Sequence, residues 1–66
     1  MFYGGYMRET REAHGMTIAQ VAERSGIDAA HIAGLEDGTV IYTTTKKLIA
    51  IADAIGVTLS EMFHLK

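Results

Sequence analysis

The sequence predicts an all-α fold, a compact bundle of five helices that forms one domain over residues 1–66. Apolar residues recur at the three- and four-residue spacing of helices, threonine capping patterns precede several of these segments, and glycines follow them. The 66 residues include 0 Pro and 0 Cys, so the sequence has no proline to interrupt a helix and no cysteine for a disulfide or zinc site.

The chain opens with a short arm, residues 1–6, that combines aromatic side chains with two adjacent glycines. Its aromatic rings could cover the core or contact a partner. The first helix is expected from Met7 to His14, and Gly15 supplies the stop.

The second and third helices are expected between Thr17 and Gly38. Thr17 and Gln20 have the spacing of a capping box, which opens the second helix. Gly26 permits a sharp turn, and Asp28 is placed to cap the third helix. The side chains expected to face inward from this region are Val21, Ile27, Ile32 and Leu35.

A loop rich in β-branched residues, 39–43, should precede the fourth helix, which Thr44 or Thr45 can cap and Gly56 ends. Its apolar positions recur with helical spacing. They are Leu48, Ile51, Ala52 and Ile55.

A second capping-box pattern, Thr58 with Glu61, opens a short fifth helix. This end of the chain carries more apolar surface than a small monomer can readily cover, so we expect a homodimer. The predicted dimer interface consists of Leu59, Met62, Phe63 and Leu65. The alternative is that these side chains pack inward on the first and fourth helices.

The composition argues against several classes of function. The formal net charge of -2 gives no global attraction to nucleic acid. The longest apolar run, residues 48–52, is too short to span a bilayer, and no secretory signal is visible, so we expect a soluble intracellular protein. The histidines His14, His31 and His64 lack metal-site spacing, and no nucleophile has a recognisable base. We therefore expect no enzyme activity, metal or cofactor.

The order of helices, caps and glycines resembles the phage repressor and Cro-like helix-turn-helix family, also called the xenobiotic-response-element (XRE) family. The likeness covers nearly all of residues 7–63. It is carried by Met16, Thr17, Val21, Ala22, Glu23, Gly26, Ile27, Ile32, Leu35, Glu36, Gly38 and residues 51–57. The resemblance implies a cytoplasmic DNA-binding transcriptional regulator, of repressor or Cro type, from a prokaryotic or phage context.

The resemblance also implies roles for single residues. Arg11 and Glu36 match an ion pair that joins the first and third helices. The third helix would enter the major groove of double-stranded DNA. Its base-facing positions are Ala29, Ala30, His31, Ala33 and Gly34. The positions implied to contact phosphates are Thr17, Gln20, Thr43, Thr44, Thr45, Lys46 and Lys47.

This chain departs from the family pattern where bases would be read. Of the base-facing residues only His31 has a side chain that can hydrogen-bond, and residues 26–45 hold three acids and no Lys or Arg. A second hypothesis follows, in which a degenerate helix-turn-helix of the anti-repressor or antitoxin type binds another protein. The third helix or the N-terminal arm would then contact that protein.

Overall fold

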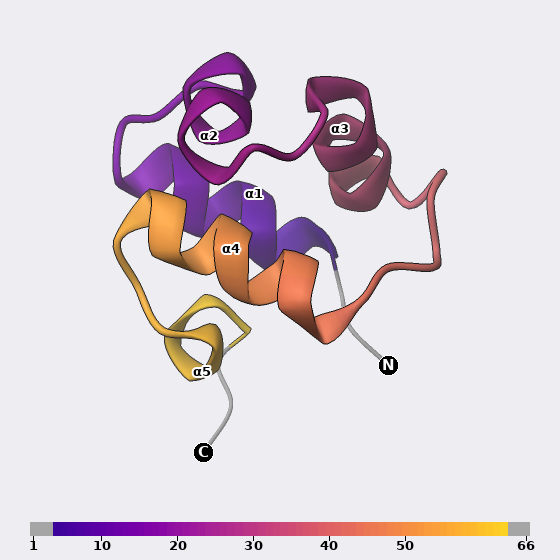
Figure 1. Ribbon diagram of the computed structural model, residues 1–66. Helices are drawn as coiled ribbons and strands as arrows, with labels where there is room; N and C mark the ends of the chain where they lie inside the picture. Colours follow the sequence, from indigo (N-terminus) through magenta and orange to yellow (C-terminus); the bar gives the residue numbers. More distant parts are fainter. Residues whose placement is uncertain (1–3, 64–66) are drawn as a thin grey trace.

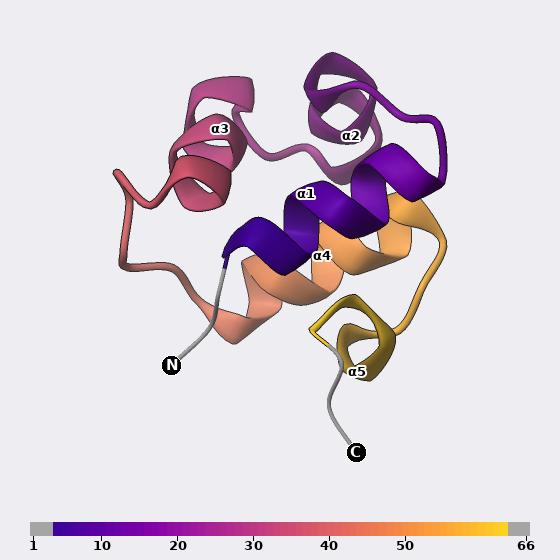
Figure 2. The same ribbon diagram turned by 180° about the vertical axis from the view of Figure 1, so that it is seen from behind.

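The computed structural model describes residues 4–63, whose capping and apolar patterns give five helices joined by short loops (Figure 1). The helices are α1 (Gly4–Ala13), α2 (Ile18–Ser25), α3 (Ala29–Asp37), α4 (Thr45–Ile55) and α5 (Leu59–Met62). No strand occurs in this described part of the chain. The helices α2 and α3 lie on one side of α1 and α4, and α5 lies on the other (Figures 1 and 2). The predicted all-α fold is confirmed.

Threonine side chains begin three of these helices. The Oγ1 atoms of Thr17, Thr44 and Thr58 each accept a hydrogen bond from the backbone N–H three residues later, at 3.1 Å. Gln20 and Glu61 return bonds to the backbone N–H of Thr17 and Thr58, at 2.9 and 3.1 Å. Both predicted capping boxes are therefore present, and Thr44 rather than Thr45 caps α4.

The core receives side chains from all five helices. The predicted inward positions Val21, Ile32 and Leu35 are buried, while Ile27 is half-buried against the same cluster. Within residues 4–63 the buried apolar residues are Met7, Val21, Ile32, Leu35, Ile51, Ala52, Ile55, Met62 and Phe63.

The first helix begins three residues earlier than the sequence predicts and ends at Ala13. Residues 4–6, expected in the arm, form its first turn, while residues 1–3 lie outside the described residues. Gly4 explains the earlier start, because an added Cβ there would collide with the backbone carbonyl of Leu35. The missing side chain lets the start of α1 approach α3 closely.

The fifth helix packs inward, contrary to the dimer interface predicted on it. Met62 is 0% exposed and Phe63 is 8% exposed, so both belong to the core of a single chain. Leu59 is half-buried against that core, and Leu65 lies outside the described residues. Packing of α5 against both α1 and α4 covers the surface that seemed excessive for a monomer.

Candidate nucleic-acid interface

A buried ion pair fixes the orientation of α3. The Nε and Nη2 atoms of Arg11 donate to Oε2 and Oε1 of Glu36 at 2.8 and 2.9 Å, and Nη1 donates to the carbonyl of Met16 at 2.8 Å. The hydrogen bond to Glu36 raises the pKa of Arg11 above its ordinary value. The predicted pair is therefore confirmed, and it joins α1, the loop after α1, and α3.

This pair removes one acid from the outward surface of α3. The side chain of Glu36 is 1% exposed, and it faces both Arg11 and the Nε atom of Arg8 at 3.5 Å. Of the three acids in residues 26–45, Glu36 therefore does not contribute to the exposed charge of α3. The exposed acids of this helix and its cap are Asp28 and Asp37.

The two remaining acids lie at opposite ends of α3. Asp28 occupies the N-cap of α3 as predicted, but its side chain makes no capping hydrogen bond. Asp37 lies at the opposite end of α3, where its Oδ1 accepts from the backbone N–H of Thr39 at 2.8 Å. Hydrogen bonding with Thr39 holds the pKa of Asp37 below its usual value. Only Asp28 adjoins the predicted base-facing residues.

The five predicted base-facing residues differ in exposure. Ala29 and Ala30 are exposed, while His31 and Ala33 are half-buried. Gly34 is buried, so its prediction as a base-facing residue was wrong. Fewer residues of α3 are therefore exposed for contact with bases than predicted. The short side chains of Ala29 and Ala30 make the exposed surface nearly flat.

Gly34 instead receives the loop that follows α3. A Cβ added to Gly34 would lie 2.5 Å from Cγ2 of Val40, and the backbone N–H of Val40 donates to the carbonyl of Gly34 at 3.0 Å. The close approach of Val40 explains why a helix-weakening glycine occupies this position. Val40 was not among the predicted site residues, because its neighbours Ile41 and Tyr42 are also apolar and nothing in the local sequence sets Val40 apart.

A second contact ties the same loop to α3. The Nε2 atom of His31 and the Oγ1 atom of Thr43 are 3.4 Å apart and form a hydrogen bond. His31 is the base-facing residue whose side chain can hydrogen-bond. It therefore lies next to Thr43, the first residue of the segment 43–47 that is predicted to contact phosphates. The loop between α3 and α4 is therefore held to α3 at Val40 and at Thr43.

The residues predicted to contact phosphates gather at two helix beginnings. Thr17 and Gln20 belong to the start of α2, and the remaining five residues lead into α4. All are exposed except Thr43, which is half-buried. The caps use Oγ1 of Thr17 and Thr44 as acceptors. Both hydroxyl hydrogens therefore remain for donation to an anion beside the helix N-terminus.

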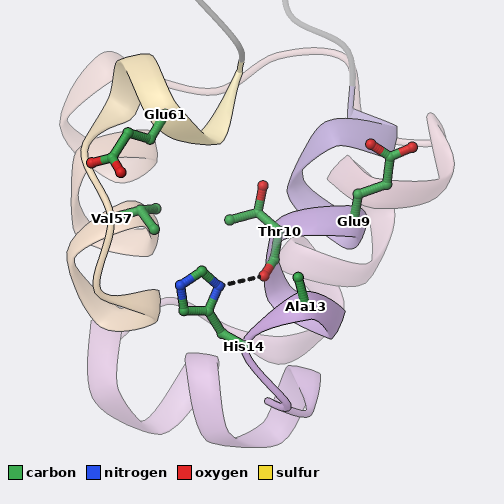
Figure 3. A pocket seen from close by; sticks show the side chains of 6 residues that line it. All are labelled: Glu9, Thr10, Ala13, His14, Val57 and Glu61. Carbon is green, nitrogen blue, oxygen red and sulfur yellow. Dashed lines mark hydrogen bonds between the residues drawn. The ribbon is translucent and has the colours of Figure 1, made fainter.

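A shallow cleft lies between α1 and the start of α5 (Figure 3). Its volume is about 320 Å³, and its lining consists of Glu9, Thr10, Ala13, His14, Val57 and Glu61. The Nδ1–H of His14 donates to the carbonyl of Thr10 at 2.9 Å. Hydrogen bonding with Thr58 lowers the pKa of Glu61, and His14 adds a smaller effect in the same direction.

Two kinds of feature are absent from residues 4–63. No three acidic or histidine side chains come together there as a metal site. No helix in this range combines the length and apolar character required to cross a membrane.

The fold and these contacts define a small helical domain in which α2, a glycine turn and α3 form a helix-turn-helix. The sequence model of the helix-turn-helix family matches residues 7–62. The chain therefore belongs to the helix-turn-helix family, in its phage repressor and Cro-like XRE group. The family comprises DNA-binding regulators and is not an enzyme family. No curated protein matches the chain.

Proposed function

We propose that the protein is a sequence-specific transcriptional regulator of the repressor or Cro type that acts as a homodimer in a prokaryotic cytoplasm. The observation that carries this proposal is the hydrogen bond between His31 and Thr43. It joins the helix that would enter the groove to the segment that would contact the backbone. Family membership supports the same function.

In this proposal the start of α3 reads DNA mainly through apolar contact. Ala29 and Ala30 are exposed and match the thymine C5-methyl group, which alanine contacts favourably in the major groove. His31 already bonds Thr43 through Nε2, so Nδ1 remains for a base edge. We therefore expect modest discrimination that favours thymine-containing sites.

Contacts with the backbone would supply most of the affinity. The hydroxyls of Thr17 and Thr44 lie at helix N-termini, where free backbone N–H groups favour an anion. Lys47 is exposed in the first turn of α4, where lysine is unfavourable to the helix dipole without an external anion. Phosphate groups of DNA would provide that anion.

A titration with generic duplex DNA at about 50 mM salt tests the proposal, and binding should weaken as salt rises. Replacing Lys47 by Gln should reduce the slope of log K against log salt by about 0.9, the amount expected for one lost phosphate contact. The matched control is Arg24→Gln, which removes an exposed cation outside the proposed contacts and should leave the slope unchanged. Replacing thymine by uracil in the duplex should also weaken binding, because it removes only the methyl group.

The alternative function is that of a protein-interaction module. It is favoured by the lack of hydrogen-bonding side chains on Ala29 and Ala30 and by the exposed Asp28 beside them. Such a module would give no detectable shift with duplex DNA at about 50 mM salt, and that result would overturn the DNA-binding proposal. Equal slopes for the Lys47→Gln and Arg24→Gln proteins would remove Lys47 from the phosphate contacts.

A further inference from the structure

The outer face of α4 has no partner within the described chain. Lys46, Ile49, Ala50 and Asp53 share this face, because they recur at intervals of three and four residues. Ile49 is 52% exposed, which is unusual for a large aliphatic side chain in so small a domain. Lys46 and Asp53 are exposed, and among residues 4–63 neither side chain forms an ion pair or hydrogen bond.

We propose that this face binds the same face of a second copy of the chain, with the two α4 helices antiparallel across a twofold axis. Residues 46, 49, 50 and 53 form the α4 seam. Around an axis between residues 49 and 50, Lys46 opposes Asp53 of the second copy and Ile49 opposes Ala50. The surface is then self-complementary, as a twofold interface requires. This inference rests on the proposed function, because it names the surface of the proposed homodimer.

The two charges specify both the partner and its direction. Lys46 and Asp53 are seven residues apart, about 10 Å along the helix, so they do not pair within one copy. A parallel arrangement would place each charge opposite its own kind, whereas an antiparallel arrangement creates two opposite-charge pairs. The apolar contact of Ile49 over the small Ala50 lies between these pairs, and alanine allows the helices to approach closely.

The loop before α4 carries two further exposed apolar side chains. Ile41 and Tyr42 are 68% and 83% exposed, and they lie in the loop between α3 and α4. The three large apolar side chains that are exposed within residues 4–63 are these two and Ile49. A stable interface buries about 800 Å² on each partner, more than one face of an 11-residue helix supplies. The loop would provide the remainder.

The α4 seam gives the two adjacent lysines separate roles. At about 100° per residue, the four residues of the α4 seam span about 100° of the helix surface, and Lys47 points about 60° outside that span. Lys46 would pair with Asp53 of the second copy, and Lys47 would remain for phosphate. Substituting the two lysines singly therefore separates dimer formation from DNA contact.

Sedimentation equilibrium of the full chain, without DNA, tests the α4 seam. Asp53→Lys should weaken the dimer on the order of tenfold, because the twofold axis counts each repulsive pair twice. The exchanged variant Lys46→Asp with Asp53→Lys should recover the parent dissociation constant. The control Glu23→Lys makes the same change of charge at an exposed position on α2 and should leave the dissociation constant of the dimer unchanged. Ile49→Ser should weaken the dimer without altering net charge, and circular dichroism checks that each variant folds.

The outcomes separate this inference from the proposed function. A chain that remains monomeric at all concentrations would overturn both the homodimer and the α4 seam. A dimer that tolerates Asp53→Lys and Ile49→Ser, or an exchanged variant that stays monomeric, would overturn the seam and leave the homodimer standing. Loss of DNA binding in a chain whose dimer responds as described would overturn only the DNA contacts.

Discussion

Replacing Glu36 by Gln should cause a large loss of stability, because it leaves the guanidinium of Arg11 buried without its counter-ion. Removing one partner of a buried ion pair costs about 3–5 kcal/mol. The side chain of Arg11 keeps 11% exposure, so some water reaches it and we expect about 3 kcal/mol. A domain of 66 residues has roughly 3–10 kcal/mol of total stability. The melting temperature should fall by roughly 12–24 °C.

Urea denaturation followed by circular dichroism measures this change directly. The control Glu23→Gln makes the same chemical change at an exposed residue and should alter stability by less than about 0.5 kcal/mol. Replacing Arg11 and Glu36 together by Met should cost less than Glu36→Gln alone, because no buried charge remains. A Glu36→Gln protein within about 1 kcal/mol of the parent would refute the reasoning, since the pair would then be no more than a surface salt bridge.

Two further predictions concern the loop after α3 and the acidic caps. Gly34→Ala should destabilise the domain by about 1–3 kcal/mol through overpacking against Val40. In a Val40→Ala background the same substitution should cost less, because only the Cβ of residue 40, at 3.2 Å, remains close, and urea denaturation of the four proteins measures that coupling. Asp37 and Glu61 have lowered pKa values in the folded chain. Their contribution to the stability of the fold is therefore present above their pKa values in the unfolded chain. It is lost as the pH falls through their pKa values in the folded chain. Thermal melts should show falling stability below about pH 4.5, and Glu61→Gln should reduce that fall; an unchanged pH profile would contradict the assignment.

Local rules predicted the helices and their caps because those interactions are short in sequence. Thr17 and Thr58 each bond a residue three positions away, and that spacing is visible without knowledge of the fold. The pairing of Arg11 with Glu36 spans 25 residues. It was predicted only through the family resemblance, because no local pattern links the two positions.

The errors arose where long-range packing decides the environment of a residue. The family resemblance placed Gly34 among the base-facing residues, but the loop that follows α3 returns to cover it with Val40. The early start of α1 depends on Gly4 meeting the backbone of α3, which glycine's weak helix propensity does not suggest. The burial of Met62 depends on where α5 packs, and an apolar pattern alone does not distinguish a core from an interface.

The two contacts between α3 and the following loop have a thermodynamic consequence for recognition. Val40 and Thr43 hold the loop in one conformation before any ligand arrives. A flexible loop would lose conformational entropy on binding, and that loss would weaken the complex. Here the ordering has already taken place during folding, so the groove-facing helix and its neighbouring segment would meet DNA as one rigid body. Preorganisation of this kind can partly offset the small number of polar side chains on α3.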